Sequence, residues 1–290
     1  MTTCRARFSY PGTAGSIRRF QEGKMRRFAA SMLMLIVGLG GSVAVGETVK
    51  IRDNSFLIEE AYNQEPGVIQ HIQAFQYMKD GSWGYTFTEE WPAPRETHQL
   101  SATIPVDRLR REGTETGIGD ILLNYRYQLL LRDLVALSPR LSLILPTGDE
   151  DRGLGEGTLG FQGNIPLSVE LTDRWVTHWN LGMTYVPRGR GPGGAREDTY
   201  GFNYGASAVF LVSENFNFLV EGAGETTEAV TGIGMTESES SFFLNPGVRF
   251  AWNHKSGLQV VPGIGVPIGV GPSRGEYGVF LYLSFEHPLF

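Results

Sequence analysis

Apolar and polar side chains alternate along much of the chain after about residue 67. The pattern is plainest in residues 118–130, where every second residue is apolar: Ile121, Leu123, Tyr125, Tyr127 and Leu129. The residues between them are mostly polar and include Asp120, Asn124, Arg126 and Gln128. A period of two is typical of a β-strand whose two faces meet different surroundings. The sequence therefore predicts an all-β protein.

The same alternation recurs to the end of the chain and predicts about twelve strands. Ten or fourteen strands are the alternatives, because strand ends predicted from sequence shift by several residues. The expected ranges are 67–78, 82–91, 97–106, 118–130, 135–146, 158–171, 175–186, 199–212, 216–225, 240–252, 257–268 and 277–286.

The connections between these strands differ in length on the two sides of the expected sheet. The joins after the even strands are short, as in 172–174 and 213–215. Those after the odd strands are mostly long and polar: 107–117, 147–157, 187–198, 226–239 and 269–276. A soluble β-sandwich also produces alternating strands, but here the apolar faces are long and end in Trp and Tyr. These features predict a transmembrane antiparallel barrel over residues 67–290, with short periplasmic turns, longer extracellular loops and both termini periplasmic.

The first 46 residues predict export. From Met25 two arginines precede a mostly apolar run, 28–43, and Ala44-Val45-Gly46 follows it. A basic start, a short apolar core and small residues describe a signal peptide, here about 25–46 and cleaved near Gly46, rather than a membrane anchor. Residues 1–24 form an upstream extension, and translation starts at Met1 or at Met25.

Removal of this segment changes the charge and the cysteine content. The remaining chain has 18 basic and 30 acidic residues, a net charge of −12, and it lacks the single cysteine, Cys4. An acidic protein of this kind is a poor partner for nucleic acid. Without cysteine it forms neither disulfides nor thiolate metal sites.

The segment 47–66 precedes the first expected strand and carries an apolar cluster of Phe56, Leu57, Ile58 and Tyr62. It forms either an ordered plug in the periplasmic mouth, with a short helix, or a disordered leader. The plug is favoured because exposed apolar residues in a row are poorly tolerated.

Several charged residues fall on the expected lumen face: Arg126, Arg140, Arg249, Asp120, Glu170, Glu221 and His178. Charges inside a small barrel must be paired or hydrated. They form either a network that holds the barrel closed or a lumen that screens solutes by charge. Arg126 and Arg140 are expected to be neighbours across the turn 131–134, and this arrangement requires an acid or an anion between them.

Two other patterns suggest chemistry. Residues 155–160 read G-x-G-x-x-G, but the residues that follow alternate as a strand and include Pro166, whereas a dinucleotide-binding turn needs a helix there. We therefore expect no nucleotide or other cofactor. The acids of the same loop, Asp149, Glu150, Asp151 and Glu156, lack a calcium-loop spacing. A solvated loop is favoured over one that binds cations of lipopolysaccharide, and no metal site is predicted.

A hydrolase is a third possibility. Across the turn 172–174, Ser168 is expected opposite His178, with Glu170 and Asn180 on the same face. A serine beside a histidine is a candidate nucleophile and base. This pair points inward, away from lipid, so we expect no enzyme.

The start of the mature chain, DNSFLIEEAYNQEPGVIQHI (53–72), and the later Leu145-Pro146-Thr147-Gly148-Asp149 carry a resemblance to a known family. They resemble the outer-membrane transporter family named after the meta-pathway of phenol degradation, and the similarity covers most of the mature chain. The resemblance implies a small outer-membrane barrel that passes hydrophobic or aromatic compounds. A largely filled structural barrel is the main alternative.

The expected partners follow from this placement. They are outer-membrane lipids and lipopolysaccharide, a small-molecule solute, and the barrel assembly machinery, which recognises a terminal aromatic residue such as Phe290.

Overall fold

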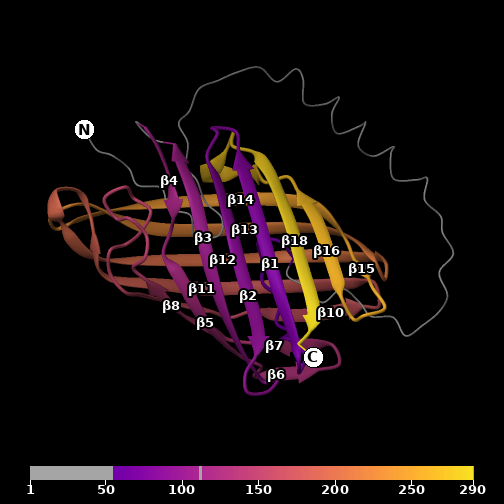
Figure 1. The fold of residues 1–290 in the computed structure, drawn as a ribbon. Helices are drawn as coiled ribbons and strands as arrows, with labels where there is room; N and C mark the ends of the chain where they lie inside the picture. Colours follow the sequence, from indigo (N-terminus) through magenta and orange to yellow (C-terminus); the bar gives the residue numbers. More distant parts are fainter. Residues whose placement is uncertain (1–54, 111–112, 290) are drawn as a thin grey trace, which may run out of the picture. The chain divides into compact units, whose positions relative to one another are not determined.

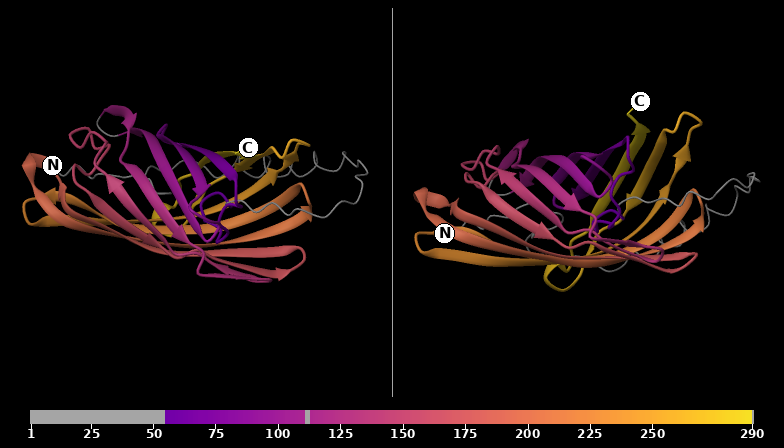
Figure 2. Two further views of the ribbon diagram at one scale, coloured as in Figure 1. Left: turned by 60° about the horizontal axis from the view of Figure 1, so that its bottom comes forward. Right: turned by 90° about the horizontal axis from the view of Figure 1, so that it is seen from below.

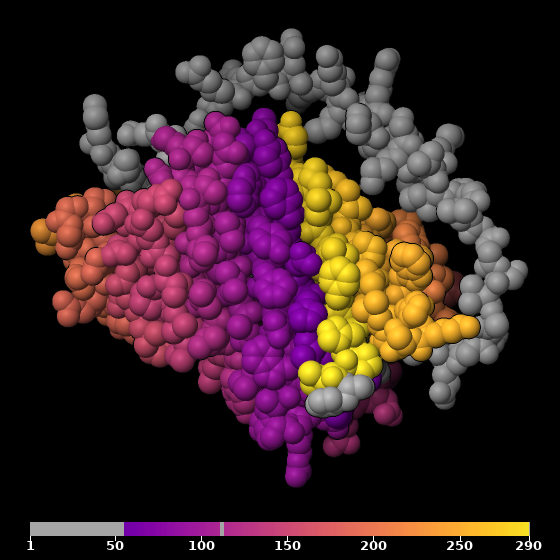
Figure 3. All heavy atoms as spheres, viewed as in Figure 1, coloured from indigo at the N-terminus to yellow at the C-terminus, as the bar shows by residue number. Residues whose placement is uncertain are grey.

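The chain folds into one closed antiparallel β-barrel (Figure 1). The computed structural model describes residues 55–110 and 113–289. The expected signal peptide at 25–46, the first part of the plug segment (47–54) and Phe290 lie outside these residues. The last strand, β18 (Gly278–Pro288), pairs with the first, β1 (Val68–Met78), from Val68 opposite Pro288 to Met78 opposite Gly278. This pairing closes the barrel, and Figure 3 shows the two strands side by side along its outer surface.

Seven of the strands that cross the wall are unbroken. They are β1, β2 (Trp83–Pro92), β3 (His98–Arg110), β11 (Trp175–Arg190), β12 (Arg196–Ser213), β13 (Phe216–Gly232) and β18.

Five more crossings are each divided into two or three strands that lie in line. They are β4 (Thr114–Ile118) with β5 (Ile121–Tyr127) and β6 (Leu130–Arg132); β7 (Val135–Leu137) with β8 (Arg140–Leu145); β9 (Gly160–Asn164) with β10 (Leu167–Thr172); β14 (Met235–Phe250) with β15 (Trp252–Asn253); and β16 (Gln259–Gly265) with β17 (Ile268–Gly269). Pro139, Pro166 and Pro267 stand at three of the breaks, where proline has no N–H to give to the ladder. The total of twelve crossings confirms the expected strand number.

The two ends of the barrel differ. At one end, which we call the proximal end, β1 begins, β18 ends and the turns are short, as at 133–134, 173–174 and 214–215. At the other end, which we call the distal end, the prediction of long loops is wrong for three segments. The segments 107–117, 187–198 and 226–239 are largely strand, and two of them turn at 191–195, which contains the 3-10 turn η1 (Pro192–Gly194), and at 233–234. These extensions make β11 to β14 the longest strands (Figure 2).

The sequence missed the extensions because their residues do not alternate in polarity. The start of β14, Met-Thr-Glu-Ser-Glu-Ser-Ser, is polar on both faces, as suits a hairpin that stands in water beyond an apolar belt. Two distal loops remain long, 146–159 and 270–277, and the second contains η2 (Gly271–Ser273).

The two faces of the wall have opposite polarity. Along β11, Val176, His178 and Asn180 are buried inside the barrel, whereas Trp179 and Leu181 are more than half exposed on its outer surface. An apolar outer face and a polar lumen are the reverse of a soluble protein and are typical of a barrel surrounded by lipid. Within the described residues, no helix has the length and hydropathy needed to cross a membrane.

The core of the protein lies inside the barrel and is centred on the segment that precedes β1. We call residues 55–66 the plug. Phe56 packs against Phe280 and Tyr282 of β18, with ring centroids 5.4 and 5.5 Å away. Leu57 and Ile58 join the same cluster of buried side chains, which comes from β1, β11, β12, β13, β16 and β18. The apolar cluster noted in the sequence is thus enclosed by the barrel.

Wall glycines make room for the plug. A Cβ atom on Gly263 would lie 2.5 Å from Cε1 of Phe56, and one on Gly205 would lie 2.4 Å from Cδ1 of Ile58. Real Cβ atoms do not approach other carbons so closely, so a larger residue at either position must displace the plug. The plug therefore fits against the wall partly because the wall has glycine at these two positions.

We expect Gly263→Ala to destabilise the barrel, because it overpacks the pocket of Phe56. Overpacking a core costs roughly 1–3 kcal/mol of unfolding free energy. The measurement is thermal unfolding, followed by the shift in gel mobility that barrels show when they unfold. Gly201→Ala is the matched control, since its Cβ would meet nothing nearer than 3.4 Å. In a protein that carries Phe56→Ala, Gly263→Ala should lower the stability much less, because the ring that it overpacks is gone. An equal loss of stability in that background would contradict the explanation.

Candidate functional site: the lumen and its plug

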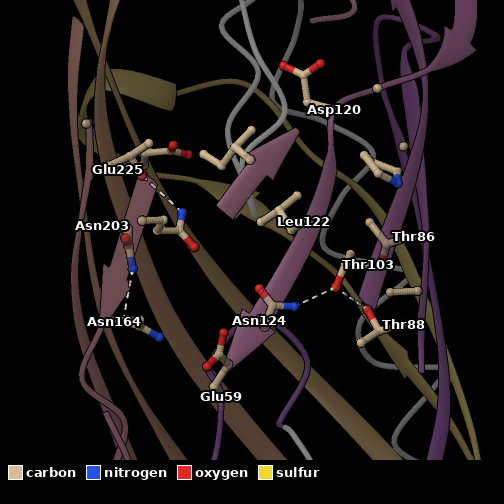
Figure 4. A pocket seen from close by; sticks show the side chains of 18 of the residues that line it. Glu59, Thr86, Thr88, Thr103, Asp120, Leu122, Asn124, Asn164, Asn203 and Glu225 are labelled. Carbon is tan, nitrogen blue, oxygen red and sulfur yellow. Dashed lines mark hydrogen bonds between the residues drawn. The ribbon is translucent and has the colours of Figure 1, made fainter. Parts of the chain in front are cut away.

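A cavity of about 280 Å³ lies inside the barrel on the distal side of the plug. Phe56, Leu57, Ile58 and Glu59 of the plug line one end of it, and Asp120 and Leu154 line it near the distal loops. Figure 4 shows Glu59 and Asn124 toward one end and Asp120 toward the other.

The wall of the cavity is a mixture of hydroxyl, amide and apolar groups. Thr88 and Thr103 share a hydrogen bond of 2.9 Å between their hydroxyls, and Asn124 donates to Thr103 at 3.3 Å (Figure 4). Apolar surface comes from Ile72, Ala74, Leu122, Ile144, Phe280 and Tyr282. The cavity therefore offers both polar partners and apolar contact to a small molecule.

One buried carboxylate, that of Glu221 on β13, fixes the start of the plug. Its Oε1 accepts hydrogen bonds from three consecutive backbone N–H groups, those of Phe56 (2.9 Å), Leu57 (2.8 Å) and Ile58 (3.1 Å). Its Oε2 accepts from the Asn245 amide at 2.8 Å. Consecutive N–H groups that converge on an anion also occur at the first turn of a helix, but here no helical turn follows, and residues 55–66 contain no helix. The expectation of a short helix is therefore wrong.

Further wall side chains satisfy the backbone of the middle and end of the plug. Asn180 accepts from the Glu59 N–H at 2.9 Å and donates to the Glu59 carbonyl at 2.8 Å. Ser168 accepts from the Ala61 N–H at 2.8 Å, and Gln128 donates to the Ala61 carbonyl at 2.8 Å. Because a buried backbone polar group without a partner is costly, these side chains define the path of the plug across the lumen.

Arg126 and Arg140, which the sequence predicted to be neighbours, are directly opposite one another in the pairing of β5 with β8. Like charges directly opposite in a sheet repel. The nearest acids that offset this repulsion come from the plug: Nη2 of Arg140 lies 2.7 Å from Oε1 of Glu59, and Nη2 of Arg126 lies 3.5 Å from Oε1 of Glu60. A wall acid also contributes, because Oε2 of Glu90 on β2 lies 3.9 Å from Nη2 of Arg126. Burial acts to raise the pKa of Glu59, but the charge and hydrogen bond of Arg140 outweigh it, so this pKa lies below its ordinary value.

Arg126 also donates hydrogen bonds to uncharged groups of the plug, in a side chain and in the backbone. It donates from Nε to the Asn63 side chain at 3.0 Å and from Nη1 to the Glu60 carbonyl at 3.2 Å. Both arginines remain part of the cavity lining, together with Glu59. The two arginines therefore contact the plug and also form part of the cavity wall.

The other expected lumen residues lie apart from this pair. Arg249 is buried near the proximal end of β14, where Nε lies 3.3 Å from the Asn217 side-chain oxygen once that amide is oriented to suit its neighbours. Glu170 is half-buried near the proximal end of β10. Asp120 belongs to the distal end, between β4 and β5.

Asp120 anchors the loop that contains the glycine-rich pattern. Its two carboxylate oxygens accept from the N–H groups of Gly148 (2.9 Å) and Glu156 (2.7 Å). Residues 155–160 lead into strand β9, at the place where a dinucleotide-binding turn needs a helix. Of the loop's acids, Glu150 pairs with Arg190, and the described residues contain no cluster of His, Cys, Asp and Glu suited to a metal.

Ser168 and His178 are opposite one another, as the register predicted, and the serine Oγ lies 2.7 Å from Nδ1 of the histidine. The Ser168 side chain has no exposed surface, and its hydroxyl is already bound by the Ala61 N–H. The Tyr62 ring covers the His178 ring edge-on, with centroids 6.4 Å apart. In this arrangement the pair is a support for the plug.

The sequence did not identify Glu59 and Glu60 of the plug as partners of the lumen arginines, or Asn180 of the wall as a partner of the plug. A signal was present for the first two, because two arginines that require an acid can be matched with an acidic pair in a segment expected to enter the lumen. Asn180 and the clamp made by Glu221 carry no such signal, since only the folded path of the plug brings them to its backbone.

Comparisons with known proteins agree with the barrel architecture. The fold is similar to that of an outer membrane channel from Pseudomonas putida F1, with a TM-score of 0.59 and 14% sequence identity, over 85% of this chain and 99% of that one. It is also similar to the NanC porin, with a TM-score of 0.50 and 9% identity, over 74% and 98% of the two chains. At these identities the likeness shows the fold alone. No curated protein sequence matches the chain.

A family model matches residues 70–283, which is more than two thirds of the sequence. That span begins in β1 and ends in β18, so it covers nearly the whole barrel. The chain therefore belongs to the family described as "Putative MetA-pathway of phenol degradation".

Proposed function

We propose that the protein is an outer-membrane channel for small, apolar or aromatic solutes, and that the plug closes it in the structure described here. The single observation that carries the proposal is the cavity of about 280 Å³ inside a closed barrel, blocked at one end by a segment held through side chains. Its volume lies just below the roughly 300–1,000 Å³ typical of small-molecule sites.

The plug is bound to the wall by side chains and not by a strand ladder, and this supports the proposal that it moves. The hydrogen bonds of Phe56, Leu57, Ile58, Glu59 and Ala61 described above are made by wall side chains. Water or a polar solute can replace such partners one at a time, whereas a strand leaves a sheet only by breaking a whole ladder. The plug is therefore a better candidate for the moving part than any wall strand.

The placement of the protein in the cell is part of the proposal. The proximal end, where β1 begins and β18 ends, faces the periplasm, and a signal peptide at about 25–46 directs export. Phe290 is the contact for the barrel assembly machinery, and lipids and lipopolysaccharide surround the exposed apolar outer face.

A filled structural barrel is the alternative, and the dense contacts between plug and wall favour it. The two functions differ in what a loosened plug does. We expect Glu221→Ala to raise solute flux across proteoliposomes by about tenfold or more, because it removes hydrogen bonds worth roughly 1.5–3 kcal/mol each from the closed state. Flux of a small aromatic alcohol and of a small sugar is measured in vesicles.

Glu237→Ala is the matched control, since this acid is exposed on the distal hairpin of β14 and touches neither plug nor cavity. Its flux should equal that of the unmodified protein. If Glu221→Ala vesicles, with the barrel shown to be folded, are no more permeable than vesicles without protein, the barrel is structural.

A lipid hydrolase that uses Ser168 and His178 is tested in the same vesicles by release of fatty acid. We expect no hydrolysis from the unmodified protein, because the serine is buried beneath the plug. Ser168→Ala should increase flux by less than Glu221→Ala does, since it removes one plug contact instead of three. Fatty-acid release that disappears in Ser168→Ala would show that the pair is catalytic.

A further inference from the structure

The Arg126–Arg140 pair has the properties of a binding site whose ligand is part of the same chain. Both arginines belong to the wall and line the cavity, and among the described residues they are the only cationic side chains that do so. The carboxylates that they contact most closely belong to Glu59 and Glu60 of the plug. When the plug moves out, as the proposed function requires, Arg140 loses the carboxylate of Glu59, and Arg126 loses that of Glu60 and retains the more distant carboxylate of the wall residue Glu90, 3.9 Å away.

We infer that Arg126 and Arg140 are the anion-binding subsite of the channel, which takes the carboxylate of a small organic acid in place of Glu59 and Glu60. This inference rests on the proposed function, because it needs the plug to leave the lumen. An arginine presents its donors as a planar fork that suits carboxylates. Arg140 already uses this fork, with Nε 3.1 Å from Oε2 and Nη2 2.7 Å from Oε1 of Glu59.

The neighbours of the pair define what the rest of the solute looks like. In the plug, the residues just before the two glutamates are Phe56, Leu57 and Ile58, which fill a pocket formed by Ile72, Ala74, Phe280, Tyr282 and other apolar side chains. A carboxylate held at the arginines can place an apolar body in the pocket that these three residues vacate. The plug and the inferred solute therefore share one chemical feature, an apolar group next to a carboxylate.

A second charge on the solute is disfavoured by the acids elsewhere in the cavity. Asp107, Glu225 and Glu228 line its distal part, on β3 and β13. A dianion would bring its second carboxylate toward them, whereas a monoanion can turn its uncharged end that way. The solute class is therefore a small apolar or aromatic monocarboxylate.

The test is calorimetric binding to the full-length protein in detergent, with benzoate, benzyl alcohol and terephthalate as probes. Glu59→Gln with Glu60→Gln removes the competing charges. We expect this double variant to bind benzoate about tenfold or more tightly than the unmodified protein does, because benzoate then has no plug carboxylate to displace from the two arginines. It should also prefer benzoate over benzyl alcohol and over terephthalate.

Adding Arg126→Gln and Arg140→Gln should abolish the preference for benzoate over benzyl alcohol and leave benzyl alcohol binding unchanged. If this fourfold variant does not fold, Glu59→Gln with Arg140→Gln tests the tighter of the two pairs alone, and the preference should fall. Glu237→Gln is the control for an acid outside the site. Equal binding of benzoate and benzyl alcohol by the Glu59→Gln/Glu60→Gln variant would overturn the inference, and so would a preference that survives loss of the arginines.

Failure of the inference and failure of the proposed function give different results. A barrel that passes neutral solutes but has no preference for benzoate loses only the anion subsite. A barrel that prefers benzoate in calorimetry but passes no solute in vesicles has the site and is not a channel.

Discussion

The carboxylate of Glu221 accepts three consecutive backbone N–H groups of the plug, and the rest of the lumen depends on this contact. It sets the direction in which the chain enters the barrel and brings Phe56 into the space left by Gly263. From there Asn180, Ser168 and Gln128 take up the following backbone groups. A segment without secondary structure is thus held inside a barrel because the wall supplies the partners that a helix or sheet would have supplied.

Charge pairing follows from the same path. The plug places Glu59 and Glu60 beside two arginines that the sheet register sets opposite one another. Arg126 and Arg140 alone would repel, and the two glutamates alone would be charges taken out of water, so each pair makes burial of the other tolerable. Blocking of the lumen by the plug and the proposed selection of solute therefore depend on one set of contacts.

The parts of the structure that repeat could be predicted from sequence. A period of two gave the strands, and the short joins gave their order, because each strand has one face on lipid and the other on the lumen. The distal hairpins were missed because a strand with water on both faces loses that period, as the start of β14 shows. The opposition of Ser168 and His178, and the closeness of Arg126 and Arg140, followed from counting residues across tight turns.

The path of the plug could not be predicted in this way. Contacts such as Ser55 with Ser207, or Phe56 with Glu221, join residues more than 150 positions apart, and no periodicity relates them. The sequence showed that an apolar, acidic segment precedes the barrel, and it showed that Arg126 and Arg140 require an acid or an anion between them. Which side chain would receive which backbone group depends on the closed shape of the wall.

The central claim is that the plug must move for solute to pass, and a reversible lock on the plug tests it most directly. The hydroxyls of Ser55 and Ser207 are 2.6 Å apart, so cysteines at both positions can form a disulfide between plug and wall. In a chain that also carries Cys4→Ser, we expect the oxidised protein to pass no more solute than empty vesicles, and a reducing agent to restore the flux of the unmodified protein. Equal flux through the oxidised and reduced forms would contradict the account.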